Sequence, residues 1–302
     1  MAAALALLLA PLGGAPSIAV RPAAALVADD NGMIAFTRTD GGRQDVYVMN
    51  SDGSGQTNVT QRAMADFGPR WSPDGARIAF TSLRPEKGDG PVNQDVYVMN
   101  SDGTGQTRLT TDPAIDLEPT WSPKGDRIAF TSDRGENTDI YVMAADGTGP
   151  TPLTTDPGTD VSPDWSPDGA HIAFASNRDG DFEIFVMNAD GTNPTQLTND
   201  VDNQTDNEPT WSPDGNRIAF LSTRAGDPEI FVMNADGTNP TRLTTDGGTD
   251  AEPAWSPDGK RLAFITTRDG GAEIWTTNAD GTGQAALTKG PADDGPDWSA
   301  PH

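Results

Sequence analysis

The chain has 302 residues, of which 45 are acidic and 20 are basic, so its formal net charge is -25. This balance argues against a nucleic-acid partner, because binding to a phosphate backbone depends on Lys and Arg side chains that neutralise the phosphates. The sequence contains no cysteine, which excludes disulfides, thiolate metal sites and cysteine nucleophiles.

The first 25 residues have the pattern of an export signal. Residues 2–12 form an apolar run that is too short to span a bilayer, and the small residues Ala23, Ala24 and Ala25 follow as a cleavage site. We therefore expect a signal peptide over residues 1–25, one domain over residues 26–302, and a periplasmic or secreted protein. No basic residue precedes the apolar run, so a disordered Ala-rich tail is the alternative. No later segment predicts a transmembrane helix.

One sequence unit is repeated from about residue 31 onward. Its first copy, residues 34–36 (Ile-Ala-Phe), has no tryptophan before it. The later copies each begin with a Pro-x-Trp segment, and these tryptophans lie 43 to 50 residues apart, which is the size of one propeller blade. They are Trp71, Trp121, Trp165, Trp211, Trp255 and Trp298.

Each repeat predicts four β-strands. The first strand ends at the Trp, and in five copies a Ser-Pro-Asp/Lys-Gly turn follows, in which Pro presets φ and Gly accepts a positive φ. An Ile/Leu-Ala-Phe run predicts the second strand, and a run such as residues 96–99 (Val-Tyr-Val-Met) predicts the third. An Asp-Gly hairpin turn leads to a short fourth strand. The near-continuous apolar runs are typical of sheets that are buried on both faces.

The two ends of the chain carry complementary parts of one repeat. The N-terminal part begins at a second strand, residues 33–37, whereas the C-terminal part stops at a lone first strand, residues 296–299. We therefore predict an all-β fold: a six-bladed β-propeller of four-stranded antiparallel blades, with the ring closed by pairing the C-terminal strand with the N-terminal blade. The alternative, an open solenoid, would leave both partial blades unpaired.

The repeated motif resembles that of a known family. Trp-Ser-Pro-Asp-Gly, then Ile-Ala-Phe, then Ile-Tyr-Val-Met-Asn-x-Asp-Gly and Leu-Thr, is similar to the repeat of TolB-like six-bladed β-propellers across residues 31–302. The resemblance implies a fold that serves several functions. Members of this wider group are periplasmic partners of a peptidoglycan-associated lipoprotein, non-catalytic propellers of oligopeptidases, and some carbohydrate-active enzymes.

No catalytic residue is predicted, and we expect a protein that is not an enzyme. A hydrolase triad needs a nucleophile with a base, and a metal-dependent lyase of this group needs several histidines, whereas the chain has only His171 and the terminal His302. His171 takes a repeat position that is Arg in four other copies, so it is expected to replace a solvent-facing side chain. Carboxylate pairs stay open as acid and base groups, but no pair stands out.

Acidic residues recur at the start of the first strand of every repeat. An Asp lies five residues before each Trp, and we expect these side chains to circle the mouth of the central channel. They are Asp66, Asp116, Asp160, Asp206, Asp250 and Asp293. Three further carboxylates follow two residues later, namely Glu118, Glu208 and Glu252.

Every repeat also carries an Arg in the loop between its second and third strands. These residues are Arg38, Arg84, Arg134, Arg178, Arg224 and Arg268. They should emerge on the same face as the acidic ring, and we favour repeated Asp–Arg salt bridges that lock the propeller. The alternative is Ca²⁺ or a similar hard cation in the channel, because carboxylate and amide oxygens suit such ions.

The leading functional hypothesis is an exported, non-catalytic binding scaffold. We expect a monomer that engages a protein or peptide through its loop and channel face and takes part in cell-envelope processes. The alternatives are a glycan-binding or glycan-cleaving propeller and an accessory propeller related to those of oligopeptidases. Exposed aromatic side chains would favour a glycan, but the connections at residues 85–94 and 199–207 contain none. These two connections break the repeat and are predicted to carry the partner site.

Overall fold

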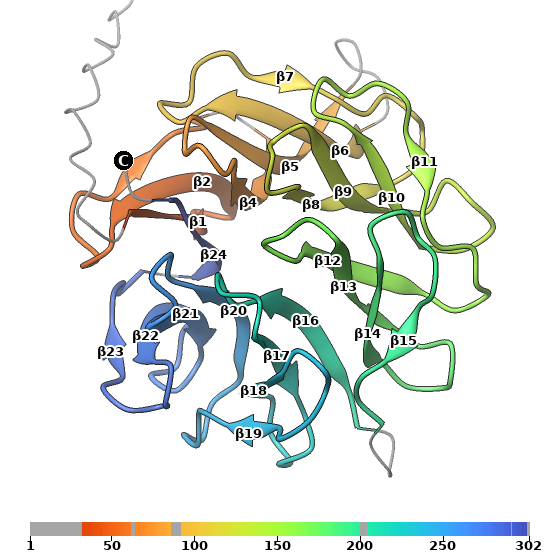
Figure 1. Cartoon of the computed structure of the whole chain (residues 1–302). Coiled ribbons are helices and arrows are strands. Elements are labelled where there is room, and N and C mark those ends of the chain that lie inside the picture. The colour runs from red at the N-terminus through yellow and green to blue at the C-terminus, as the bar shows by residue number, and fades with distance from the viewer. Residues whose placement is uncertain (1–31, 62–63, 86–91, 200–203, 291, 301–302) are drawn as a thin grey trace, which may run out of the picture.

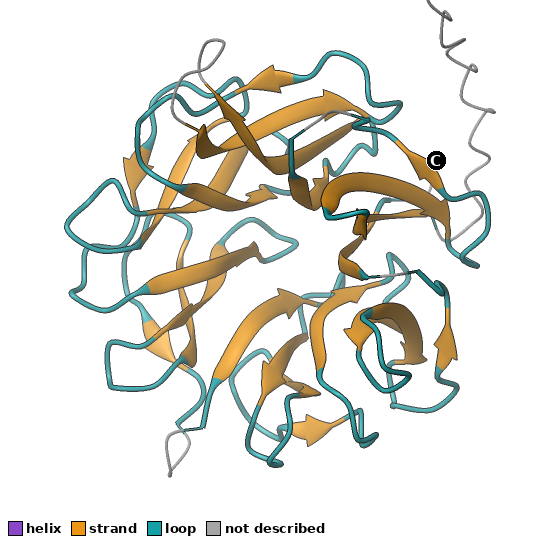
Figure 2. Ribbon diagram, turned by 180° about the vertical axis from the view of Figure 1, so that it is seen from behind, coloured by secondary structure: helices purple, strands orange, loops and turns teal. Residues whose placement is uncertain are grey.

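The computed structural model describes residues 32–61, 64–85, 92–199, 204–290 and 292–300. Within these ranges the fold is all-β, and 24 strands form six four-stranded antiparallel sheets around a central axis (Figure 1). The view from behind shows the same ring of sheets (Figure 2). The predicted signal peptide and His302 lie outside the described residues. In the described ranges, no helix is long and apolar enough to cross a membrane.

The blades are numbered around the ring, and their strands are given from the inside outward. Blade 1 contains β24 (Asp293–Trp298), β1 (Met33–Asp40), β2 (Arg43–Asn50) and β3 (Thr57–Asn58). Blade 2 contains β4 (Asp66–Trp71), β5 (Arg77–Pro85), β6 (Val92–Asn100) and β7 (Thr107–Arg108). Blade 3 contains β8 (Asp116–Trp121), β9 (Arg127–Ser132), β10 (Asp139–Ala144) and β11 (Thr151–Pro152).

The second half of the ring repeats this order. Blade 4 contains β12 (Asp160–Trp165), β13 (His171–Ser176), β14 (Glu183–Asn188) and β15 (Thr195–Gln196). Blade 5 contains β16 (Asp206–Trp211), β17 (Arg217–Ser222), β18 (Glu229–Asn234) and β19 (Thr241–Arg242). Blade 6 contains β20 (Asp250–Trp255), β21 (Arg261–Thr266), β22 (Glu273–Asn278) and β23 (Ala285–Ala286).

Blade 1 joins the two ends of the chain, and the predicted ring closure is confirmed. The C-terminal strand β24 pairs antiparallel with β1, with Ile34 opposite Trp298. Beyond the strand, the Ser299 N–H donates to the Met33 carbonyl oxygen at 2.7 Å, and the Met33 N–H donates to Ser299 Oγ at 2.8 Å. This pairing covers the inner edge of β1, which an open chain of blades would expose.

The hydrophobic core lies between the blades. The second-strand Phe of every blade is 0% exposed: Phe36, Phe80, Phe130, Phe174, Phe220 and Phe264. Each core cluster takes side chains from two neighbouring blades, as where Val46 and Val48 of β2 pack with Trp71 and Phe80 of blade 2. Both faces of the sheets are therefore covered, which explains why the strand sequences are apolar at nearly every position.

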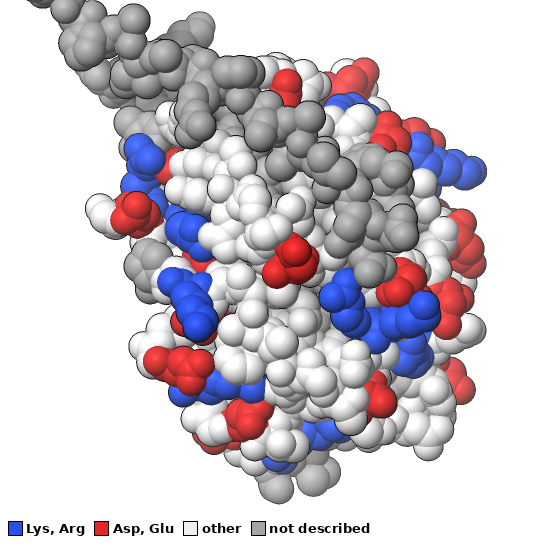
Figure 3. Space-filling view, turned by 90° about the vertical axis from the view of Figure 1, so that its left-hand side faces the viewer, with Lys and Arg blue, Asp and Glu red and all other residues white. Residues whose placement is uncertain are grey.

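Alternating strand directions give the disc two different faces. The Ser-Pro-Asp-Gly and Asp-Gly-Thr turns lie on one face, the turn face, and the second-to-third-strand loops and blade-to-blade connections lie on the other, the loop face. At Gly103, with a φ of 84°, a Cβ would lie 2.1 Å from the Val59 carbonyl oxygen, so this turn requires glycine. Seen edge-on, charged side chains gather along the two faces, and the wall between them is mostly uncharged (Figure 3).

Candidate functional site

The predicted Asp and Arg rings pair one to one within the blades. The antiparallel register places the first residue of each inner strand beside the end of the second strand, as for Asp293 and Arg38. The pairs are Arg38–Asp293, Arg84–Asp66, Arg134–Asp116, Arg178–Asp160, Arg224–Asp206 and Arg268–Asp250, with shortest distances of 2.5 to 3.1 Å. Each guanidinium also lies 4.5 to 5.6 Å from the centroids of aromatic rings of its own blade. These contacts stabilise individual blades.

The nine acidic residues that were predicted to circle the channel mouth fall into two groups. The six Asp residues are 0% exposed and do not belong to the residues that line the central channel, whereas Glu118, Glu208 and Glu252 do line it. An Asp and a Glu two residues apart would point the same way in a regular strand. A β-bulge separates them, because the pairing register of the inner strand shifts after its second residue, as between Leu117 and Thr120.

The bulge recurs in all six inner strands and forms the channel wall. The third residue of the inner strand has a positive φ in every blade: Gly68 (60°), Glu118 (52°), Ser162 (54°), Glu208 (55°), Glu252 (51°) and Gly295 (60°). The left-handed conformation costs a residue with a Cβ about 1 kcal/mol. Backbone strain of this kind clusters at active sites, ligand-binding sites and switch regions. Four of the six positions accept this cost and carry a polar side chain into the channel.

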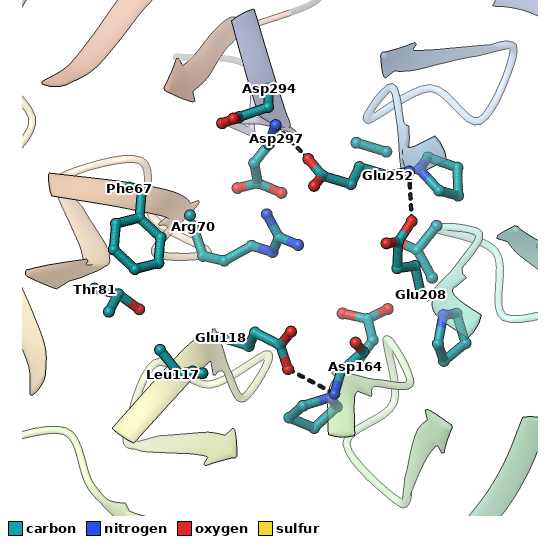
Figure 4. A pocket seen from close by; sticks show the side chains of 18 of the residues that line it. Phe67, Arg70, Thr81, Leu117, Glu118, Asp164, Glu208, Glu252, Asp294 and Asp297 are labelled. Carbon is teal, nitrogen blue, oxygen red and sulfur yellow. Dashed lines mark hydrogen bonds between the residues drawn. The ribbon is translucent and has the colours of Figure 1, made fainter. Parts of the chain in front are cut away.

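The three channel Glu side chains connect neighbouring blades. Glu118 Oε2 accepts a hydrogen bond from the Ser162 N–H at 2.8 Å, and Glu208 Oε2 accepts one from the Glu252 N–H at 2.7 Å. Glu252 Oε2 accepts from the Gly295 N–H in the same way (Figure 4). Each carboxylate thus satisfies a backbone donor that the bulge has removed from its own ladder.

A second set of charged side chains lies one residue before the repeat Trp in three of the blades. Asp164 Oδ2 accepts from the Trp211 N–H at 2.7 Å, and Asp297 Oδ2 accepts from the Trp71 N–H at 2.6 Å. Arg70 takes the same repeat position, and its guanidinium extends into the channel among the carboxylates (Figure 4). The Arg70 Nη1 group donates to the Pro69 carbonyl oxygen at 3.1 Å.

Carboxylates outnumber basic groups around the channel, which encloses a cavity of about 280 Å³. The described lining residues include one basic side chain, Arg70, and six acidic ones, Glu118, Asp164, Glu208, Glu252, Asp294 and Asp297. Burial raises the pKa of Asp164 to about 7 and that of Asp297 to about 6, although Arg70 and a backbone N–H oppose the shift at each. Burial also raises the pKa values of Glu208 and Glu252, and at Glu252 the charge of Glu208 adds to this effect. These carboxyls are therefore only partly ionised near neutral pH, and a cationic ligand in the channel would favour their ionised form.

The described part of the chain contains no group of three or more His, Asp or Glu side chains arranged to hold a metal ion. Several channel carboxylates are instead occupied by backbone N–H groups of the next blade. The arrangement therefore gives no support to the predicted alternative of Ca²⁺ in the channel.

The two long connections that were predicted to carry the partner site are only partly described. Residues 86–91 and 200–203 lie outside the described ranges. At the end of the first connection, Asn93 Nδ2 donates to the carbonyl oxygens of Asp112, at 3.0 Å, and Ala114, at 2.7 Å. Asn93 thereby ties the loop-face end of β6 to the connection that leads into blade 3.

Sequence reasoning missed Arg70, Asp164, Asp294 and Asp297. A signal was available for three of them, because the residue before the repeat Trp changes from blade to blade while the Pro and Trp beside it recur. The residues at this position are Arg70, Thr120, Asp164, Thr210, Ala254 and Asp297. Variation in charge at one position of a regular repeat indicates that blade packing does not dictate the side chain there.

Comparison with known proteins identifies the family. The model of the TolB beta propeller domain matches residues 86–158 and 151–302, which is most of the chain. A Protein TolB homolog from Chlorobium luteolum is 41% identical over 54 residues, which is 18% of this chain and 12% of that protein's length. The structure of TolB from Acinetobacter baumannii is similar with a TM-score of 0.79 at 22% identity, over 90% of this chain and 67% of that one. A structure assigned as TolB from Agrobacterium tumefaciens has a TM-score of 0.69 at 23% identity, over 85% and 88% of the two chains. The chain therefore belongs to the TolB β-propeller domain family.

Proposed function

We propose that this protein is an exported, non-catalytic scaffold of the cell envelope that binds a partner protein by admitting a segment of it into the channel from the loop face. The observation that carries the proposal is the channel itself, a cavity of about 280 Å³ with six carboxylates and one Arg among its described lining residues. A segment with Lys, Arg or amide side chains would complement this wall, because opposite charges favour both encounter and register.

The chemistry of the channel favours binding over catalysis. Its carboxylates accept hydrogen bonds from backbone N–H groups across blade boundaries, so they hold the wall together as well as facing the cavity. His171 lines a different cavity, between blades 4 and 5 on the turn face. Among the described channel residues the one aromatic side chain is Phe67, which offers little stacking surface to a sugar ring.

A matched pair of double variants tests the proposal. A partner is first captured from envelope extract with the wild-type domain and identified, and its dissociation constant is then measured for each variant. Binding is measured at pH 8, where both carboxyls are ionised. In the channel variant, Asp164→Asn with Asp297→Asn, an amide oxygen still accepts the backbone hydrogen bond while two negative charges are removed. We expect binding at least about tenfold weaker and less sensitive to salt.

The control is Asp146→Asn with Asp280→Asn, which removes the same charge from exposed Asp-Gly-Thr turns on the turn face. It should bind the partner as the wild type does. Equal affinity of the channel variant and the wild type would move the partner site away from the channel. Equal weakening by both variants would show that the loss of affinity comes from the change in net charge and not from the channel.

A further inference from the structure

At four blade boundaries an Arg of one blade covers the Trp of the next. The Arg begins the second strand, on the turn face, and its guanidinium lies over the indole ring at 4.5 to 5.1 Å. The pairs are Arg77–Trp121, Arg127–Trp165, Arg217–Trp255 and Arg261–Trp298. In one of them the Arg217 Nη2 group also donates to the Gly259 carbonyl oxygen in the next Ser-Pro-Asp-Gly turn, at 3.2 Å. The protein thus contains four internal sites at which the Trp indole ring of one blade binds a guanidinium group of the preceding blade.

Two boundaries lack the Arg, and they differ from each other. Met33 takes the position in blade 1, where it is 2% exposed and packs in one cluster with Trp71, which is 6% exposed. His171 takes it in blade 4, and there Trp211 is only partly buried, whereas the other five repeat tryptophans are 5 to 7% exposed. Methionine therefore closes its boundary with apolar contacts, and histidine leaves its boundary open.

The open boundary is a cavity of about 430 Å³, which we call the Trp211 pocket. It is lined by Trp211, His171 and Gly215 and by the carboxylates of Asp168, Asp214 and Asp236. Hydrogen bonds from Ser166, Ser212 and Thr238 lower the pKa values of these three Asp residues, so they are ionised at neutral pH. No Lys or Arg belongs to the described residues of this lining.

We propose that the Trp211 pocket binds the guanidinium group of an arginine side chain from a partner protein. The guanidinium replaces the missing internal Arg: its face stacks on the Trp211 indole, and its N–H groups reach the surrounding carboxylates. The Gly215 carbonyl corresponds in the repeat to the Gly259 carbonyl that accepts from Arg217. A planar, delocalised cation suits this combination better than the compact ammonium group of lysine. The site lies on the turn face, so it is independent of the channel.

The test follows the indole N–H signals of the full chain by NMR while N-acetyl-arginine amide is added. The Trp211 signal, assigned with Trp211→Phe, should shift and saturate with a dissociation constant on the order of 10 mM. The citrulline derivative, which keeps the shape and lacks the charge, should bind at least about tenfold more weakly, and so should the lysine derivative. Equal shifts with citrulline would overturn the proposal, and equal shifts with lysine would overturn the assignment to guanidinium.

Two exchanged variants make the test specific to this boundary. In His171→Arg the internal guanidinium should fill the pocket, abolish the Trp211 response and raise the melting temperature by about 1–3 °C. In Arg127→His the neighbouring boundary should open, so that Trp165, unresponsive in the wild type, responds to the arginine derivative. A Trp211 response that persists unchanged in His171→Arg would overturn the proposal, as would a wild-type Trp211 signal that does not move.

Discussion

The blade interiors and the channel wall use the same inner strand in opposite ways. At its first position all six blades carry an Asp that is fully buried and paired with an Arg of the same blade. At its third position the backbone is equally uniform, with a left-handed φ in every blade, but the residue is Gly, Glu or Ser. The first position therefore serves the construction of every blade, and the third shows where side chains can change without loss of the fold.

Removal of residues 291–302 should have the largest effect. It deletes β24, opens the edge of β1 and leaves Arg38 without its Asp293 partner. We expect aggregation or loss of the cooperative thermal transition in circular dichroism, because the exposed edge and unpaired charge both disfavour the closed ring. A chain that ends at residue 300 is the control and should melt as the full chain does. An unchanged midpoint without β24 would contradict closure by this strand.

Replacement of one blade Asp should have the next largest effect. Asp116→Ala leaves the Arg134 guanidinium, whose side chain is 12% exposed, without its carboxylate partner. We expect a loss of about 3 kcal/mol in the free energy of unfolding, measured by urea titration. The double variant Asp116→Leu with Arg134→Met removes both charges and should recover much of that loss. If Asp116→Ala were as stable as the wild type, the Asp–Arg pairs would not support the blades.

The channel carboxylates should make stability fall as the pH rises. An unfolded Asp loses its proton near its ordinary pKa of 3.8, whereas folded Asp164 and Asp297 keep theirs up to about pH 7 and about pH 6. Between these values the folded state binds more protons, so the free energy of unfolding decreases from about pH 4 to pH 7. In Asp164→Asn with Asp297→Asn this fall should be smaller by about 4 kcal/mol, measured by urea unfolding at pH 5 and pH 8.

The turn-face variant Asp146→Asn with Asp280→Asn is the control for the pH measurement. The pKa values of these two exposed carboxyls are lowered by hydrogen bonds within their turns, so their titration lies below that window. This variant should keep the wild-type slope between pH 5 and pH 8. An identical slope in the channel variant would show that Asp164 and Asp297 do not hold protons in the folded state.

Replacement of a glycine at the β-bulge should have the smallest effect on stability. Gly68 has a φ of 60°, and a Cβ built there meets nothing within 4 Å, so Gly68→Ala introduces backbone strain and no clash. We expect a loss of about 1 kcal/mol in the free energy of unfolding. Gly247→Ala is the matched control, because Gly247 also has open space but no positive φ, and it should be neutral or slightly stabilising. Equal effects of the two changes would remove the backbone argument for the channel ring.

The repeat alone was sufficient to predict the construction of the propeller. The Trp, Ser-Pro-Asp-Gly and Ile-Ala-Phe motifs predicted strands and turns through local chemistry, and the two partial repeats predicted the pairing of β24 with β1. The same periodicity placed the Asp and Arg residues on one face. It could not show that they would pair within each blade, because side-chain direction along the inner strand depends on a β-bulge. The Glu and Ser residues at the bulge do not predict it from sequence.

The channel and the Trp211 pocket were decided by tertiary structure. Asp164 meets the Trp211 N–H, and His171 lines a pocket with Trp211, across a blade boundary that separates residues 40 to 47 positions apart in the sequence. His171 was predicted to replace a solvent-facing side chain, and only the packing of blade 4 on blade 5 shows which Trp it leaves uncovered. The sequence by itself determined how each blade is built, because the contacts within a blade are local. The two candidate sites lie where different blades are in contact, and no local sequence pattern encodes contacts between residues so far apart in the chain.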